Sequence, residues 1–143
     1  MTKSEKIIRK YSDYAMVAGL APVPLFDLVS IGAIQLKMIA ELCKVYDKKF
    51  DANQAEIIVA AISSSLFIRY AASPLKLIPY FGLLIGGLTV STLAGKSTRM
   101  IGEAFDKHLA EGGDIFNLDI NKLKEKFKNT EDKASVTDDK NSD

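Results

Sequence analysis

The sequence predicts an all-α protein of two packed helical hairpins (four main helices, the last long and glycine-rich), a short amphipathic helix and a disordered tail. Apolar residues recur at helical spacing through four stretches, which proline and glycine separate. No stretch shows the strict apolar–polar alternation of a half-buried strand. The 143 residues fit one domain over 1–128, with hairpins at 4–46 and 51–111 and a charged tail at 129–143.

The first helix is expected over residues 4–20, with Ser4 as its N-cap. Pro22 and Pro24 follow it and end it, because proline disfavours helical backbone at the preceding residue and has no N–H to donate. Its opening turns are basic, and cations near an anionic lipid surface are stabilised. The candidates for contact with a membrane surface are therefore Lys6, Arg9 and Lys10.

The second helix is expected over residues 25–46, where polar side chains form only a narrow stripe. A helix of this kind is mostly surrounded by protein or lipid. Asp27 lies in its first turn and is expected to cap backbone N–H groups rather than to bind a ligand. Away from the stripe, Gly32 is expected to admit a close helix contact. Gln35 requires a hydrogen-bond partner, either within the chain or across a symmetric interface.

The third helix is expected over residues 51–72, because Asp51 followed by Gln54 resembles a capping box. The fourth helix is expected over residues 80–109 and is ended by two glycines. A short amphipathic helix over 119–127 follows. The tail beyond it is charged and small, so it cannot bury enough apolar surface to fold.

Residues 57–95 carry only two formal charges, Arg69 and Lys76, and residues 77–95 carry none. The uncharged run is nearly as long as the ~20-residue helix that crosses a bilayer core of about 30 Å. Pro79 interrupts it near its start, so the sequence leaves open whether lipid or protein surrounds it. Small residues at four-residue spacing let helices approach closely in either medium, and the candidates are Gly82, Gly86, Gly87 and Gly95.

The composition gives no support to several functional classes. A net charge of +1 without a basic stripe provides no general reason to expect nucleic acid as a partner. The single cysteine, Cys43, excludes an internal disulfide framework and a cysteine-based zinc cluster. It lies in an apolar helical pattern, so it is interpreted as a small buried side chain.

Two sequence features resemble catalytic or nucleotide-binding motifs. Gly95-Lys96-Ser97 matches the end of a phosphate-binding loop, but Val90 stands where the first glycine is needed and the residues lie inside a helical run. His108 is the only histidine, and it is expected to interact with the C-terminus of the fourth helix. The sequence therefore predicts a protein that is not an enzyme and has no cofactor or metal.

Two segments of this sequence resemble the YcjF-type domain, a bacterial domain of unknown function often found after an Era-like GTPase domain or encoded alone. The first contains Pro22-Val23-Pro24, Asp27, Gln35-x-x-Met38-Ile39 and Leu42-x-x-x-Tyr46. The second contains Lys76-Leu77-Ile78-Pro79-Tyr80-Phe81-Gly82 and a small-residue helix that ends near Gly95. The resemblance covers about residues 14–111, and it departs from the family where Tyr80 and Phe81 occupy a turn that often holds a smaller residue.

The resemblance implies an all-helical, non-enzymatic module that associates with membranes and works beside a GTPase. Because this chain contains no GTPase domain, the GTPase would be a separate partner. The leading hypothesis is an accessory module on the cytoplasmic face of the inner membrane, docking on lipid and on a partner protein. The alternative is a cytoplasmic bundle that self-associates and mediates protein–protein interaction.

Overall fold

The computed structural model describes residues 1–20, 24–71 and 81–138, with side chains described for 1–20, 29–62, 91–92 and 94–129. The described chain forms five helices and, over these ranges, no strand. The helices are α1 (Lys3–Ala18), α2 (Pro24–Val45), α3 (Ala52–Ala71), α4 (Phe81–Ala110) and α5 (Ile120–Asp138). The predicted all-α fold class is confirmed.

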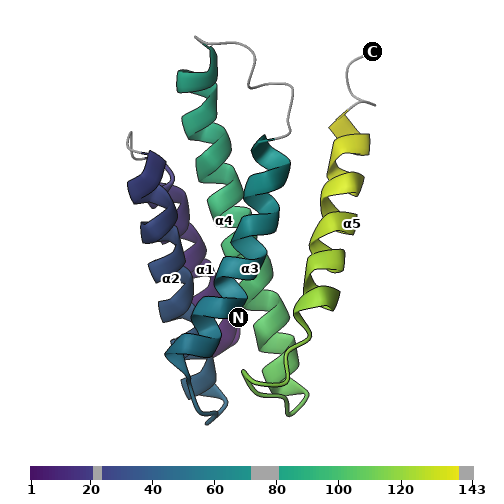
Figure 1. The fold of residues 1–143 in the computed structure, drawn as a ribbon. Helices are drawn as coiled ribbons and strands as arrows, with labels where there is room; N and C mark the ends of the chain where they lie inside the picture. The colour runs from purple at the N-terminus through teal and green to yellow at the C-terminus, as the bar shows by residue number, and fades with distance from the viewer. Residues whose placement is uncertain (21–23, 72–80, 139–143) are drawn as a thin grey trace.

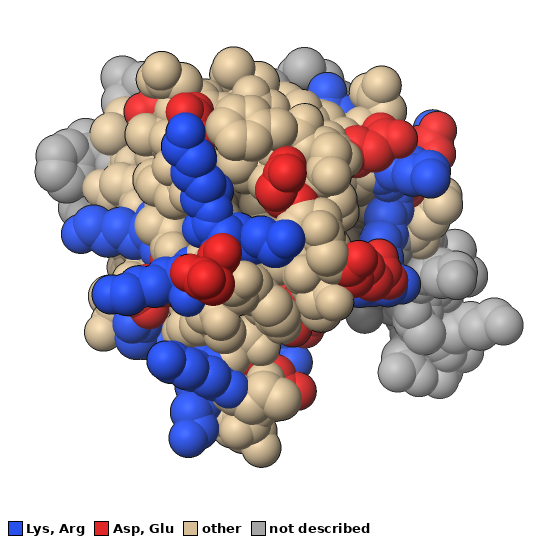
Figure 2. Space-filling model, turned by 90° about the horizontal axis from the view of Figure 1, so that it is seen from below, with Lys and Arg blue, Asp and Glu red and all other residues tan. Residues whose placement is uncertain are grey.

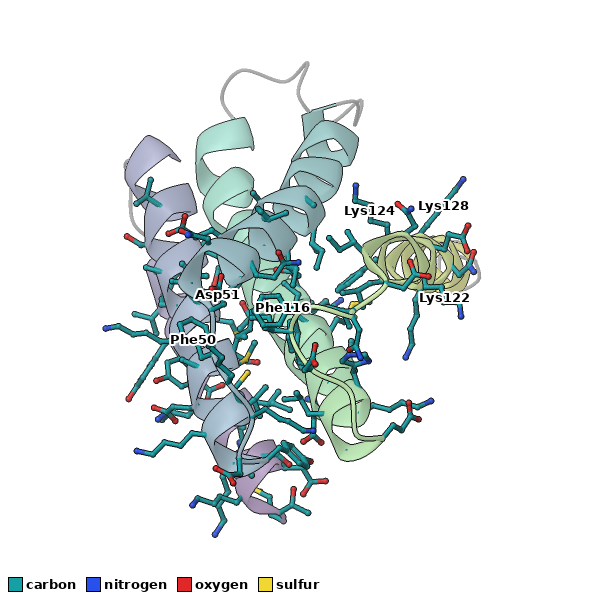
Figure 3. The ribbon with its side chains drawn as sticks, turned by 60° about the horizontal axis from the view of Figure 1, so that its bottom comes forward. Phe50, Asp51, Phe116, Lys122, Lys124 and Lys128 are labelled. Carbon is teal, nitrogen blue, oxygen red and sulfur yellow. The ribbon has the colours of Figure 1, made fainter. Side chains whose placement is uncertain are left out.

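Helices α1 to α4 run alternately in opposite directions (Figure 1), and α5 is inclined to them, because it is seen nearly end-on in the view of Figure 3 that shows α4 along its length. α1 packs against both α2 and α4, α2 also contacts α3, and α3 contacts α5. The start of α1, the end of α2, the start of α3 and the end of α4 therefore share one end of the bundle. The end of α1, the start of α2, the end of α3 and the start of α4 share the other.

Thr2, not Ser4, is the N-cap of α1. The Thr2 hydroxyl accepts from the backbone N–H of Glu5 at 3.1 Å, and the Glu5 carboxylate accepts from the backbone N–H of Thr2 at 2.6 Å. This reciprocal pair is a capping box, which satisfies two N–H groups that the helix cannot. The predicted cap at Ser4 is wrong because Thr2 has the glutamate three residues later that the box needs, and Ser4 is buried inside the helix.

The ends of α2 and α4 share one backbone motif. Asp47 has φ 53° and Gly112 has φ 89°, so each follows its helix in the left-handed conformation. The backbone N–H of Lys48 donates to Cys43 O at 2.8 Å, and that of Gly113 donates to His108 O at 3.0 Å. These bonds are those of a Schellman motif, which satisfies the last carbonyls of a helix.

α3 begins where the sequence predicts. The backbone N–H of Gln54 donates to the Asp51 carboxylate at 2.8 Å, so Asp51 caps the helix as expected.

The main core lies in the half of the bundle near the start of α1. All five helices contribute to it, and its largest fully buried side chains include Phe105, Met38, Ile39, Leu42, Ile58, Ile62 and Ile101. A second, smaller cluster toward the other end contains Ala15, Ile31 and Ala94. The main core is therefore built from many large side chains, whereas the described interior of the other half combines alanines with Ile31 and Ile34.

α5 is longer than predicted. The sequence predicts a short helix over 119–127 and a disordered tail from 129, whereas helical backbone continues to Asp138. Leu123 and Phe127 are buried against the main core, which fixes the first half of the helix. The residues that follow include Glu, Lys and Ala, which favour helix, so propagation from the anchored turns continues into the polar segment. Residues 139–143 lie outside the described chain.

Candidate functional site: the charge-poor end of the bundle

The antiparallel arrangement brings the charge-poor parts of four helices to one end. They are residues 14–20 at the end of α1 and just beyond it, 24–36 of α2, 57–71 of α3 and 81–95 of α4, and we call this half of the bundle the charge-poor end. Asp27 and Arg69 are the formal charges within these ranges. We call the opposite end, where the Lys, Arg, Asp and Glu side chains of Figure 2 crowd together, the charged end.

Large apolar side chains are exposed on the described surface of the charge-poor end. Val17 is 69% exposed at the end of α1, and Val29 is 74% exposed near the start of α2. Others on this hairpin are Tyr14, Met16 and Leu20. Single exposed apolar residues are ordinary, but several of them at the end of one hairpin indicate a surface used for contact.

Small residues bring α1 and α4 close together beside this surface. A Cβ built on Gly95 would collide with Met16 Cγ and would lie 3.6 Å from the backbone oxygen of Ser12. The Ser91 hydroxyl donates to Met16 O at 2.7 Å. Gly95, which the sequence singled out, therefore lies in protein, against α1.

The sequence analysis missed Gly102, where a Cβ would lie 2.8 Å from Ile8 Cγ1 and 3.0 Å from Met38 Sδ. The spacing of Gly102 from other small residues of α4 could have indicated this contact. Ser91, Gly95, Thr98 and Gly102 follow one another at steps of four, three and four residues, which places them on one face of α4. The close contact thus extends from the charge-poor end into the main core.

Gln35 lies at the same level of the bundle and is 1% exposed. Its Nε2 donates to Thr98 Oγ1 at 3.1 Å, which joins α2 to α4 within one chain. The other amide atom, Oε1, is buried and has no hydrogen-bond partner within the described part of the chain. Exchanging the two amide atoms would leave the nitrogen unpaired instead, so Gln35 keeps one unsatisfied polar atom in either assignment.

Gly32 makes no close helix contact within the described part of the bundle. A Cβ built there meets no atom within 4 Å among the residues that the structure describes, so the close contact expected from its position opposite the polar stripe is not found in this part of the chain. The position of a residue on a helix predicts the direction in which it points. It does not predict whether another helix packs against that side.

Lys10 is not free for a membrane surface, which corrects the sequence-based expectation. Its ammonium lies 3.1 and 3.0 Å from the two carboxylate oxygens of Glu41, and 4.5 Å from the centre of the Tyr11 ring. The Tyr11 hydroxyl donates to Glu41 Oε1 at 2.6 Å. This hydroxyl and then Lys10 lower the pKa of Glu41, while the bond to Glu41 raises the pKa of Lys10. The cluster joins α1 to α2.

The other predicted residues are distributed along the bundle. Lys6 and Arg9 are exposed on α1, on the charged side of Tyr14, and Met38 is fully buried in the main core. Pro24 is the first residue of α2, and Asp27 follows in the same helix, although its side chain lies outside the description. Gly82, Gly86 and Gly87 lie in α4, whereas Pro22 and Pro79 lie outside the described residues.

The motif that resembles a nucleotide-binding loop lies inside α4. Gly95 contacts α1, and the Ser97 hydroxyl is buried and donates to Ala94 O at 3.1 Å. These residues do not form the open loop of backbone N–H groups that binds phosphates. The thiol of Cys43 is fully buried, as expected, and burial raises its pKa.

The His108 side chain hydrogen-bonds to the loop that follows α4, whereas the sequence predicts an interaction with the C-terminus of that helix. Its Nε2 lies 2.9 Å from Asp114 O and 2.7 Å from Asn117 Oδ1, in the loop that leads to α5. Both neighbours are acceptors, so Nε2 carries the proton. Among the residues that the structure describes, no group of three His, Cys, Asp or Glu side chains could hold a metal ion.

Exposed aromatic side chains are also present at the charged end. Phe50 and Phe116 lie on the loops before α3 and before α5, and Figure 3 shows both beside the start of these helices. Lys48 Nζ donates to Gly112 O at 3.3 Å and links the two loops. Basic side chains dominate the first half of α5, where Lys122, Lys124 and Lys128 are labelled in the figure.

A search for membrane-spanning segments over the described ranges finds no helix that is both long enough and apolar enough to cross a bilayer.

Comparison with known proteins places this architecture in one family. The model of the family described as "Domain of unknown function (DUF697)" matches residues 1–134. Magnetosome membrane protein 22 of Magnetospirillum gryphiswaldense is 34% identical over 138 residues, which cover 93% of this chain and 71% of that protein. No solved structure matches. The expectation of an uncharacterised bacterial family is confirmed.

Proposed function

The chain belongs to the DUF697 family of domains of unknown function, and we propose that it is a non-enzymatic module that docks its charge-poor end on a membrane. The observation that carries the proposal is the gathering of four charge-poor helix segments at one end, with exposed apolar side chains on the α1–α2 hairpin. The similarity to a protein named as a magnetosome membrane protein supports the choice of a membrane as the partner.

The dimensions of the charge-poor end favour shallow insertion. Residues 24–36 of α2 and 81–95 of α4 extend about 20 Å at 1.5 Å per residue. The hydrocarbon core of a bilayer is about 30 Å thick, so a segment of this length reaches through one leaflet and not through both. A module that inserts one end of a helical bundle needs no spanning helix.

The orientation follows from the charges. The charged end carries the starts of α1 and α3 and the ends of α2 and α4, and immersing it in hydrocarbon would cost several kcal/mol for each unpaired charge. It therefore faces water. This end is where a separate GTPase or other partner protein would dock, a role that we propose from the resemblance to GTPase-associated domains alone.

A vesicle flotation experiment tests the membrane proposal. Val17→Asp with Val29→Asp places two carboxylates on the exposed surface of the charge-poor end, where neither side chain is buried in the fold. At about 2.5–3.5 kcal/mol for a carboxylate moved into hydrocarbon, the double variant is expected to lose more than 100-fold in vesicle binding. Phe116→Asp makes the same kind of change at the charged end and is the matched control, expected to bind like the wild type.

Two results would overturn the proposal. One is a wild-type protein that stays with the aqueous fraction in the presence of vesicles and forms a monodisperse oligomer, which would favour the self-associating bundle. The other is equal loss of binding in the Phe116→Asp control, which would show that the exposed apolar residues of the two ends act alike. Circular dichroism of each variant verifies that the helices remain folded.

A further inference from the structure

We propose that Lys37 and Lys96 form the headgroup-contacting rim of the charge-poor end and give the docked module a preference for anionic phospholipids. This inference rests on the proposed function and adds to it the class of lipid and the residues that recognise it. It adds Lys37 and Lys96 to the cations at the start of α1, which the sequence singled out for this contact.

The two lysines are the first charges met on α2 and α4 when leaving the charge-poor end. Lys37 follows the charge-poor segment 24–36, and Lys96 follows the segment 81–95. Both are exposed, and neither has an ion-pair or hydrogen-bond partner in the part of the chain that the structure describes. They are free to contact an external anion.

The Gln35–Thr98 hydrogen bond fixes the levels of the two lysines relative to each other. Lys37 lies two residues beyond Gln35, and Lys96 lies two residues before Thr98. Because α2 and α4 run in the same direction, Lys37 is displaced about 3 Å toward the charged end and Lys96 about 3 Å toward the charge-poor end, which separates them by about 6 Å along the axis. A bundle inserted up to the end of its charge-poor segments would therefore place both ammonium groups within the headgroup region, which is about 5–7 Å thick on each side of a bilayer.

The cations at the start of α1 lie at or below the lower edge of this rim. Lys10 is paired with Glu41. A Cβ on Gly102 would contact both Ile8 and Met38, so the neighbouring Arg9 lies near the level of Lys37 and about 9 Å below that of Lys96. Lys6 lies almost another turn further away. Lys96 therefore lies nearest the charge-poor end, and Arg9 lies beside Lys37 at the lower edge of the rim.

Asp13, an acidic residue near the level of Lys96, provides a test in which binding is expected to increase. Asp13 is exposed, has no partner among the described residues and is the first charge on α1 below the charge-poor end. The backbone oxygen of its neighbour Ser12 lies near Gly95, which puts Asp13 beside the level of Lys96. If the rim meets anionic headgroups, removing this carboxylate must strengthen binding.

The experiment compares flotation with vesicles of phosphatidylcholine alone and of phosphatidylcholine mixed with phosphatidylglycerol. Each rim lysine is expected to contribute about fivefold to binding of the anionic vesicles, so Lys37→Gln with Lys96→Gln is expected to lose about 25-fold. Asp13→Asn is expected to gain about fivefold. On phosphatidylcholine alone, all three proteins are expected to bind equally.

Lys44→Gln with Lys49→Gln removes two exposed cations from the charged end and is the matched control. The proposal is supported if this control binds anionic vesicles like the wild type while the rim variants change as stated. It is overturned, with the docking function intact, if the wild type binds both kinds of vesicle equally or if the rim variants match the wild type. Loss of binding in the control alone overturns the proposed orientation, and absence of wild-type binding to either vesicle overturns the docking function itself.

Discussion

At Gly102 and Gly32, two glycines inside helices meet opposite surroundings. A Cβ at Gly102 would lie 2.8 Å from Ile8 Cγ1, whereas a Cβ at Gly32 would meet no atom of the described residues within 4 Å. Glycine destabilises a helix interior relative to alanine because it has more backbone freedom to lose. At Gly102 that cost is offset by close packing of α1 on α4, and at Gly32 nothing in the described structure offsets it.

Substitution of these two glycines should therefore change stability in opposite directions. Gly32→Ala is expected to raise the free energy of unfolding by about 0.5–1 kcal/mol, because only helix propensity changes. Gly102→Val is expected to lower it by about 1–3 kcal/mol, because the added atoms overpack the contact with Ile8 and Met38. Urea denaturation followed by circular dichroism measures both, and a destabilised Gly32→Ala protein would show that this position is in close contact with another residue.

The cluster of Tyr11, Lys10 and Glu41 makes a second prediction, which concerns acid. The pKa of Glu41 is lowered below its ordinary value of 4.5 in the folded protein, first by the Tyr11 hydroxyl and then by Lys10. A carboxyl whose folded pKa is depressed contributes stability above its unfolded pKa and loses that contribution as the pH falls through the folded value. The stability of the wild type should therefore fall as the pH drops below about 4.5.

Glu41→Gln is expected to show a shallower loss of stability over that acid range and a lower stability at pH 7 than the wild type. Glu103→Gln is the control, because its pair with Arg99 is exposed on both sides and contributes little. Thermal unfolding at a series of pH values measures the difference. Parallel pH profiles for the wild type and Glu41→Gln would show that the cluster does not couple to folding.

At the scale of helices, positions were largely predictable from sequence and their ends were not. Four expected ranges overlap α1 to α4 closely, because proline, glycine and the Asp51 cap mark the boundaries. The start of α1 was misplaced because Thr2 and Ser4 are both chemically suitable caps. The far end of α5 was missed because composition describes the tail as polar, whereas the burial of Phe127 anchors a helix that then continues.

One prediction at the scale of helices concerns Asp47, at the end of α2. Its φ of 53° is a conformation that L-residues adopt at a cost, and it closes α2 in the same way as Gly112 closes α4. Asp47→Gly is expected to raise the free energy of unfolding by about 1 kcal/mol, because glycine adopts this conformation without steric cost. Asp47→Ala keeps the Cβ and is expected to give no gain. A glycine variant no more stable than the alanine variant, in thermal or urea unfolding, would contradict this account.

At the scale of the whole molecule, the sequence revealed one charge-poor run, 57–95, and the structure adds two more segments to it. Residues 14–20 and 24–36 are short enough to pass as ordinary buried helix faces. Only the antiparallel arrangement shows that all the charge-poor segments meet at one end. The rim could not be predicted from the sequence either. The level of Lys37 relative to Lys96 depends on the hydrogen bond between Gln35 and Thr98, which are 63 residues apart in the sequence.

The odd number of helices has a consequence for how this domain can be joined to other domains. α1 begins at the charged end, where Tyr46 and Asp106 also lie within hydrogen-bond distance of each other. α5 ends near the level at which α3 ends (Figure 1). If the charge-poor end docks on a bilayer as proposed, a protein fused ahead of Thr2 would stay in water, separated from the bilayer by the length of the bundle. A protein fused behind α5 would emerge level with the lipid surface and compete with it for space. A bundle docked in this way leaves room for a further domain on its N-terminal side.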